Sequence, residues 1–499
     1  MIEALLGALA LIFDPYVLSV IVLSAFYGAF VGAIPGLTAT MSVALLVPVT
    51  FFMEPAPAIA AIVTTTATAI FAGDIPGALL RIPGTPASAA YVDEAYRMTR
   101  KGQAELALGA GLVTAAIGGL VGTLVLIAIA PELARFAVKF SSFEYFWLAC
   151  LGLTCAVLIS GTSVPKSFAS MLIGLLLTTI GIDITVGYPR FTFGSVELLD
   201  GISFIPAMIG MFALSEILRN VTREGHDTRA ATGRLGDVFT GLPGLLRRYR
   251  LNIARSSILG AGIGALPGAG ADIAAWIAFT ISKRFSKERD RFGTGHVEGI
   301  VDGGSANNAA VAGAWTPALV FGIPGDTVTA IAIGILYLKG LQPGPLVFTQ
   351  KPDLVYAVFI AFLVANVVLI PIGFIAIKLS SYVLRVPGNI LMPIILLFCI
   401  VGSFAINNTT FAIWIMLVLG VLAYLMEEND MPVAPAILGL VLGKMIEDTF
   451  MVSMMKTQGD FLGFFERPIA AALGVLTLAI WAFLILRPLR ALLTTRSQA

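Results

Sequence analysis

Apolar segments recur along the whole chain and are separated by short polar segments. A transmembrane helix needs about 20 predominantly apolar residues, within a range of about 17–25. In the first half the apolar runs are Val17–Ile34, Ala56–Ala72, Leu106–Ala130, Tyr145–Ser160, Phe168–Val186 and Ile202–Leu218. In the second half they are Ile253–Leu266, Ser305–Ile323, Leu354–Ile377, Ile390–Ile406, Phe411–Met426, Val433–Met445 and Ile469–Leu486. The pattern predicts an all-α polytopic membrane protein with about 12 transmembrane helices.

Three shorter apolar pieces stand just after interruptions of this pattern by Pro-Gly pairs. They are Met41–Phe52, Ile273–Ile281 and Val328–Leu338. Each is too short to span a membrane, so we expect half-helices or re-entrant arms. An interrupted helix leaves backbone N–H and C=O groups without partners. Inside a membrane, the interruption therefore has to be buried in protein or to line a cavity.

Three phrases of the sequence occur twice, in the same order. The first reads GAFVGAIPG at Gly28–Gly36 and GAGIGALPG at Gly260–Gly268, with six of nine positions identical and an offset of 232 residues. The others are Ile82–Ala89 with Ile323–Ala330, at an offset of 241, and Pro206–Gly210 with Pro435–Gly439, at an offset of 229. Interrupted apolar segments at corresponding positions of two halves indicate a transporter's binding site.

Charge is sparse and unevenly distributed. Only 12% of the residues are charged and 58% are hydrophobic, whereas a soluble domain carries about 25% charged residues. The net charge of +1 gives no indication of a nucleic-acid partner. The most basic loop, Arg219–Arg255, and the basic C-terminal tail are predicted to be cytoplasmic by the positive-inside rule. The N-terminus, which carries only Glu3 and Asp14 before the first run, is predicted to be periplasmic.

These orientations require an odd number of crossings before the basic loop, so the second half is inverted relative to the first. We therefore predict an inverted two-fold repeat. Its parts are a first membrane repeat at 1–218, a basic cytoplasmic linker at 219–251, a second membrane repeat at 252–466, and a final transmembrane helix with a basic tail at 467–499.

The Pro-Gly breaks and the polar residues beside them form the candidate substrate site. The N-terminus of a half-helix presents free N–H groups and the positive end of the helix dipole, which suits a carboxylate. The candidate substrate-binding residues at the breaks are Pro35, Gly36, Leu37, Thr38, Pro83, Gly84, Thr85, Ser88, Pro267, Gly268, Gly270, Pro324, Gly325 and Thr327. Kinks that serve helix packing alone are the alternative, and four breaks in a two-fold pattern argue against it.

Other polar residues in apolar surroundings each leave alternatives open. Arg81 is a candidate for binding the substrate carboxylate, but it could also pair with Asp74 or extend to the surface. Asn307 and Asn308 suit a substrate- or cation-binding cavity, or hydrogen bonds between helices. Asp272 and Asp326 are candidates for binding a coupling ion, Na⁺ or H⁺, and fit helix caps equally well.

The sequence carries none of the familiar catalytic patterns. It has no paired His/Glu metal motif on a helix, no G-x-S-x-G and no P-loop, so we expect neither an enzyme nor a bound cofactor. Cys150, Cys155 and Cys399 lie scattered in apolar runs, a spacing typical of buried free thiols.

Several longer motifs resemble the large membrane subunit of the tripartite tricarboxylate transporter family. In the first half these are Gly-Ala-Ile-Pro-Gly-Leu at 32–37, Ile-Pro-Gly-Thr-Pro-Ala-Ser at 82–88 and Arg-Lys-Gly-Gln-Ala at 100–104. The second half adds Gly-Ala-Leu-Pro-Gly-Ala-Gly at 264–270, Asn-Asn-Ala-Ala at 307–310, Gly-Ile-Pro-Gly at 322–325 and Leu-Gly-Leu-Val-Leu-Gly at 438–443. The chain departs from the family pattern at Asp74, Pro76 and Arg81, where Gly, Ser and Asn are usual, and at Asp272, in a stretch that is usually uncharged.

The resemblance implies a bacterial inner-membrane permease that imports a tricarboxylate, a dicarboxylate or a related organic acid by symport with Na⁺ or H⁺. It further implies two partners: a small membrane subunit and a periplasmic solute-binding protein that delivers the acid. A stand-alone carrier or a passive channel in the bilayer is the alternative, and association with further copies of the chain is left open.

Overall fold

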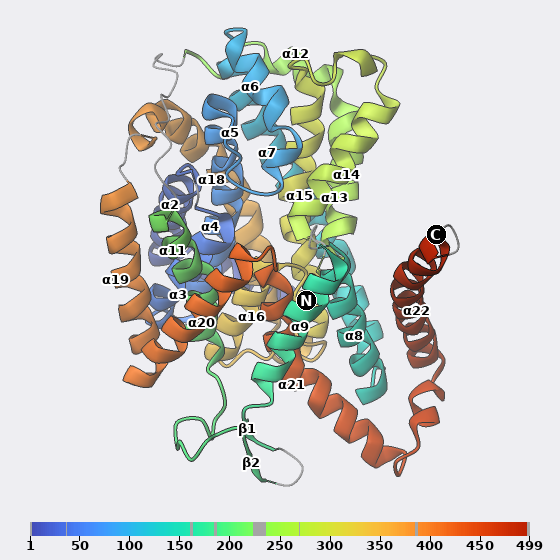
Figure 1. Cartoon of the computed structure of the whole chain (residues 1–499). Coiled ribbons are helices and arrows are strands. Elements are labelled where there is room, and N and C mark those ends of the chain that lie inside the picture. Colours follow the sequence, from blue (N-terminus) through green and yellow to red (C-terminus); the bar gives the residue numbers. More distant parts are fainter. Residues whose placement is uncertain are drawn as a thin grey trace. The chain divides into compact units, whose positions relative to one another are not determined.

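The computed structural model describes residues 2–35, 37–159, 163–183, 187–222, 236–268, 270–384 and 388–496. The described chain is mostly helical and forms two compact units (Figure 1). Unit 1 consists of Met1–Arg135 and Ser203–Asn429, and unit 2 consists of Phe136–Ile202 and Asp430–Ala499. Each unit therefore combines a segment from the first half of the chain with a segment from the second.

Unit 1 holds the Pro-Gly breaks. Its first segment contains α1 (Ile2–Ile12), α2 (Pro15–Gly32), α3 (Ala39–Phe51), α4 (Pro55–Ala72), α5 (Asp74–Leu80), the 3-10 turn η1 (Ser88–Ala90), α6 (Val92–Arg100) and α7 (Ala104–Ala137), whose last residues enter unit 2. Its second segment contains α10 (Phe204–Met208), the π-helical η2 (Ile209–Leu214), α11 (Ser215–Thr222), α12 (Leu242–Arg248), α13 (Arg250–Gly264), α14 (Gly270–Phe285), η3 (Arg289–Arg291), α15 (Val297–Phe321), α16 (Thr327–Leu338), α17 (Val347–Gln350), α18 (Pro352–Val383), α19 (Gly388–Asn407) and α20 (Thr410–Glu428).

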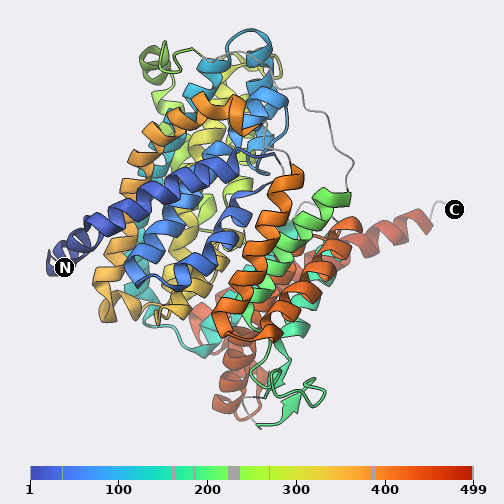
Figure 2. The same cartoon turned by 90° about the vertical axis from the view of Figure 1, so that its left-hand side faces the viewer.

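Unit 2 is smaller and contains the two strands. Its elements are α8 (Ser142–Ile159), α9 (Val164–Thr178), β1 (Gly181–Ile182), β2 (Pro189–Arg190), α21 (Val433–Lys456), η4 (Phe461–Phe465) and α22 (Pro468–Arg496). The strands pair antiparallel, with Gly181 opposite Arg190, in a loop that projects from the helices of this unit (Figure 2).

Six helical stretches among the described residues are long and apolar enough to cross a membrane. They are Pro15–Gly32, Pro55–Leu80, Ala104–Ala137, Phe204–Val221, Pro352–Ser380 and Thr410–Glu428. This confirms the all-α polytopic class, whereas the total of about 12 spans stays a prediction. The three short apolar pieces lie in α3, α14 and α16, each too short to span.

One predicted run ends earlier than its apolar pattern suggests. The run Phe168–Val186 was expected to be a single span, but α9 ends at Thr178 and β1 begins at Gly181. Gly181 has a φ of 128°, a backbone conformation that a helix does not contain. The prediction was therefore wrong about the end of this helix, and 184–186 lie outside the described residues.

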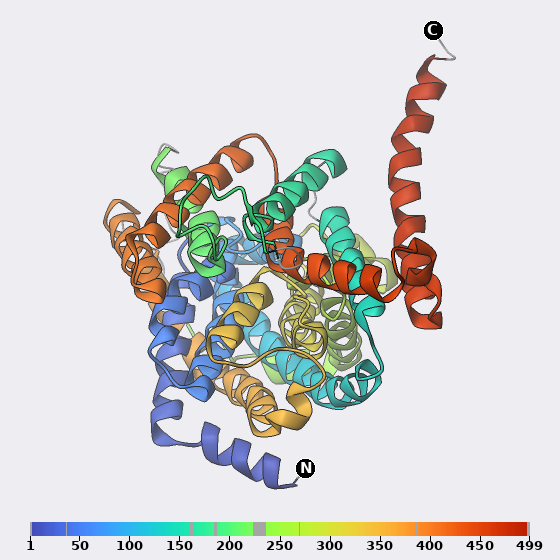
Figure 3. The same cartoon turned by 90° about the horizontal axis from the view of Figure 1, so that it is seen from below.

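Small residues let the central helices of unit 1 touch through their backbones. A Cβ added at Gly32 of α2 would lie 2.4 Å from the carbonyl oxygen of Ala69 in α4, and one at Gly264 of α13 would lie 2.2 Å from that of Ala310 in α15. This close packing of α2 on α4 and of α13 on α15 buries α4 and α15 nearly completely. At the edge of the unit, α1 packs against α18 (Figure 3).

Candidate functional site

The second and fourth Pro-Gly breaks are built in the same way. Arg81 caps the C-terminal end of α5 and Gly322 caps that of α15, both in the left-handed region with φ of 63° and 68°. The next residue in each copy turns back onto its helix: the Ile82 N–H donates to the Pro76 carbonyl at 3.4 Å, and the Ile323 N–H donates to the Pro317 carbonyl at 3.3 Å. These two helix ends stand at the offset of 241 found in the sequence.

Reciprocal capping hydrogen bonds follow both breaks. The Ser88 N–H donates to Thr85 Oγ1 and the Thr85 N–H donates to Ser88 Oγ, each at 3.1 Å. In the other copy the Thr329 N–H donates to Asp326 Oδ1 at 2.7 Å, and the Asp326 N–H donates to Thr329 Oγ1 at 2.8 Å. Asp326 is thus the N-cap of α16, the capping alternative that the sequence had left open.

Two glycines at these breaks have no room for a side chain. A Cβ added at Gly84 would lie 2.5 Å from the Cα of Gly73, and one at Gly325 would lie 2.7 Å from the Cα of Ala314. The Gly84 N–H also donates to the Gly73 carbonyl at 3.0 Å. Each break is therefore pressed against the backbone of the helix that precedes it.

All four breaks meet inside unit 1. Thr40 at the start of α3 shares a 2.9 Å hydrogen bond with Thr327 at the start of α16, which joins the first break to the fourth. A Cβ added at Gly270 would lie 2.7 Å from Asp326 Cβ, so the third break touches the fourth. The Ala87 N–H donates to Asp272 Oδ1 at 3.2 Å, which joins the second break to the third.

The breaks place helix N-termini and backbone donors close together. Thr38 is the N-cap of α3 and accepts a hydrogen bond from the Met41 N–H at 3.2 Å. Pro267 and Gly268 lead into α14, and Gly268 and Gly270 both have positive φ. Leu37 and Ser88 are buried at 1% exposure each. Gly36 lies outside the described residues.

Arg81 does not pair with Asp74. Its Nε donates to Asp93 Oδ1 at 2.7 Å, and both side chains are more than half exposed. The left-handed φ of Arg81 ends the helix there, and its side chain pairs with α6. Pairing with Asp74 was the wrong alternative, while substrate binding by Arg81 stays a prediction.

Asn307 and Asn308 are buried in α15 with their amide oxygens unpaired. The Asn308 amide donates to the Ala67 carbonyl of α4, and the Asn307 amide donates to the hydroxyl of Tyr91, each at 3.5 Å. Both Oδ1 atoms and Thr64 Oγ1 lack hydrogen-bond partners. Burying an acceptor without a hydrogen-bond partner costs free energy, so these oxygens are candidates for contact with a ligand.

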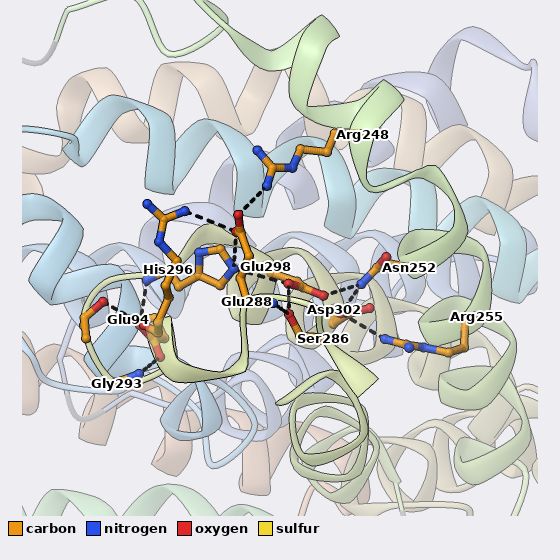
Figure 4. A network of polar contacts seen from close by, with 12 residues as sticks. Glu94, Arg248, Asn252, Arg255, Ser286, Glu288, Gly293, His296, Glu298 and Asp302 are labelled. Carbon is orange, nitrogen blue, oxygen red and sulfur yellow. Dashed lines mark hydrogen bonds and ion pairs between the residues drawn. The ribbon is translucent and has the colours of Figure 1, made fainter. Parts of the chain in front are cut away.

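Sequence reasoning missed a polar network at the loop between α14 and α15, drawn in Figure 4. Glu94 of α6 accepts backbone hydrogen bonds from Gly293, Gly295 and His296. His296 is buried at 7% exposure, with Nε2 3.2 Å from Glu298 and 3.4 Å from Glu288.

Asp302 anchors the deeper part of the same network. Fully buried in α15, it accepts from Asn252 at 3.0 Å, from Arg255 at 3.1 Å and from the Ser256 hydroxyl. These groups come from α6, α13, the loop and α15, so no local sequence motif could have revealed them.

Comparisons with known proteins point to one family. The family model described as "Tripartite tricarboxylate transporter TctA family" matches residues 18–438. The "Uncharacterized 52.8 kDa protein in TAR-I ttuC' 3'region" of Agrobacterium vitis is 35% identical over 467 residues, covering 93% of this chain and 92% of that protein. The "Uncharacterized protein in TAR-II ttuC' 3'region" of the same organism is 35% identical over 211 residues, covering 42% of this chain and 87% of that protein. No solved structure matches.

Proposed function

Because this chain belongs to the tripartite tricarboxylate transporter TctA family, a family of transporters and not of enzymes, we propose that it is the permease of a secondary active importer of a carboxylate. It would lie in the bacterial inner membrane, receive the acid from a periplasmic solute-binding protein, work with a small membrane subunit and couple uptake to Na⁺ or H⁺. Members of this family work with such partners in tripartite systems.

The meeting of four interrupted segments is the observation that carries the proposal. The N-termini of α3 and α16 converge at the Thr40–Thr327 contact, and the Thr85–Ser88 turn reaches α14 through Ala87 and Asp272. Free N–H groups and positive dipole ends at such a place favour a carboxylate. We propose that the substrate binds there, held by backbone N–H groups with Thr38, Thr85 and Ser88, and by Arg81.

We also propose that the two halves form an inverted repeat. The matched helix ends, the matched capping hydrogen bonds and the matched backbone contacts of α2 with α4 and of α13 with α15 support the repeat. The uneven distribution of charge among the loops supports its inversion. Alternating access would then follow from movement of the helices that carry the breaks, because inverted repeats allow two equivalent states around one site.

Replacing Gly84 or Gly325 by Val tests this site. Each added side chain would collide with the backbone of Gly73 or Ala314, so we expect uptake to fall at least tenfold while the protein remains in the membrane. Gly262→Val is the matched control, since Gly262 of α13 has no atom within 4 Å of an added Cβ. Uptake of labelled citrate and counterflow against unlabelled citrate would be measured with the partner subunits present. Normal uptake in Gly84→Val and Gly325→Val would contradict the proposed site, and uptake without counterflow would indicate a channel.

A further inference from the structure

Asp74 is a buried carboxylate at the start of α5. It is 8% exposed, at the first position of α5, within the helical stretch Pro55–Leu80. No ion pair joins it to a Lys or Arg in the part of the chain that the structure describes. A buried carboxylate without a positive partner is strongly disfavoured in its ionised form.

One hydroxyl group contacts this carboxylate. The Tyr91 hydroxyl donates to Asp74 Oδ1 at 2.9 Å and accepts from the Asn307 amide at 3.5 Å. Gly303 of α15 makes room for the Tyr91 ring, because a Cβ there would lie 2.3 Å from the ring. A chain of polar groups therefore runs from α15 through Tyr91 to α5. Asn307 at its end is 2% exposed, and its amide oxygen has no hydrogen-bond partner.

The surroundings of Asp74 favour a proton over a metal cation. The small cavity beside it is lined by Asp74, Ser88 and Tyr91, and otherwise by Gly, Ala, Val, Leu and Ile residues of α5, α6, α7 and α15. Tyr91 is the other titratable group that lines it. The Ser88 hydroxyl is already engaged with Thr85, at 2.8 Å from its carbonyl. Hard cations require several oxygen ligands, about six or more for Ca²⁺ and Mg²⁺, whereas the side-chain oxygens among the residues that line this cavity are those of Asp74, Ser88 and Tyr91.

Asp74 is also connected to the second break on both sides. Gly73, its neighbour, accepts the hydrogen bond from the Gly84 N–H at 3.0 Å. Tyr91, its hydrogen-bond donor, directly follows the turn that contains Ser88. A change in the charge of Asp74 therefore acts on the same loop that we assign to the substrate.

We propose that Asp74 is the proton-binding site of this carrier and that Tyr91 and Asn307 position it. The inference rests on the proposed function and assigns H⁺ as the coupling ion. One proton binds the Asp74 carboxylate from the side on which the substrate enters and leaves it on the cytoplasmic side. While it is bound, the proton neutralises the negative charge of Asp74, which would otherwise repel the substrate anion. Binding of acid and proton thus favour each other.

The test uses the full chain reconstituted into liposomes with its partner subunits, in sodium-free buffer, with labelled citrate and a pH-sensitive dye inside. We expect citrate-dependent acidification of the interior by the wild type. In Asp74→Asn, the citrate accumulation driven by a pH gradient should fall at least tenfold, and the acidification should be lost. Counterflow should stay within about twofold of the wild type, because exchange needs no net proton movement. Asp74→Glu should recover part of both, and Glu132→Gln, at an exposed pair on α7, is the control.

The remaining outcomes separate the two proposals. Wild-type citrate uptake that depends on Na⁺ without acidification would overturn the proton site and leave the carrier function standing. Normal gradient-driven accumulation by Asp74→Asn, or loss of counterflow in both Asp74 variants, would also overturn it, because Asp74 would then be a structural residue. Absence of wild-type counterflow would instead refute the proposed function.

Discussion

Replacing Glu94 by Ala should destabilise unit 1 far more than replacing its neighbour Asp93. Glu94 is 1% exposed, and its two oxygens accept backbone hydrogen bonds from Gly293, Gly295 and His296, the last two at 2.7 Å (Figure 4). Hydrogen bonds to a charged group contribute about 1.5–3 kcal/mol each. Gly293 is exposed, and its N–H can donate to water instead. The two other hydrogen bonds then account for a loss of about 3–6 kcal/mol.

Two variants make this expectation quantitative. Gly295 and His296 both donate to Oε2, so the single amide oxygen of Glu94→Gln can keep both hydrogen bonds. It loses the charge, and because neutral hydrogen bonds contribute about 0.5–1.5 kcal/mol each, the loss should be roughly 2–3 kcal/mol. Asp93→Ala breaks only the exposed pair with Arg81, which is worth at most about 1 kcal/mol. The apparent Tm of the detergent-purified chain would be followed with a thiol-reactive dye, and exposure of the buried Cys399 reports on unit 1. Equal Tm values for Glu94→Ala and Asp93→Ala would refute the reasoning.

Two other expectations test helix packing and the loop network. Gly32→Leu and Gly264→Leu should each sharply reduce the yield of folded protein in size-exclusion chromatography, because both glycines lie against a carbonyl of the neighbouring helix. Gly262→Leu, where an added side chain meets no atom within 4 Å, should leave the yield unchanged. A normal yield for Gly32→Leu or Gly264→Leu would contradict the packing. Burial of Glu288 opposes its charge, but Arg291 and Arg248 outweigh this and hold its pKa below the usual range. A lowered pKa stabilises the fold above the ordinary value of about 4.3 and ceases to do so as the pH falls through the lower native value. Glu288→Gln should therefore lower the Tm at pH 7 and have no effect well below pH 4, and a constant difference between the two pH values would contradict this.

The sequence predicted the helices and the meeting of the breaks better than the partners of single side chains. Apolar periodicity and Pro-Gly pairs are local signals, so α3, α14 and α16 and the offset of 241 could be read directly. Arg81 pairs with Asp93 and not with Asp74. The sequence did not predict this pair, because it does not indicate that Arg81 adopts a left-handed conformation at the end of α5. The Glu94 and Asp302 contacts join residues about 50 to 200 positions apart, which only the packing of α6, α13 and α15 brings together.

The two capped breaks differ in one chemically important respect. Thr85 and Asp326 occupy matching positions and accept the same kind of hydrogen bond, but one contributes a neutral hydroxyl and the other a carboxylate. A carboxylate at the N-cap offsets the positive end of the α16 dipole. The Thr85–Ser88 turn is capped by neutral hydroxyls, but the carboxylate of Asp272 already accepts a hydrogen bond from the Ala87 N–H within it. If the substrate binds among the breaks as we propose, its carboxylate would therefore face the start of α3, which the neutral Thr38 hydroxyl caps, more closely than the fourth break. Asp74 is attached to the second break through Gly73 and Tyr91, so the proposed proton site lies beside one of the breaks that we assign to the substrate.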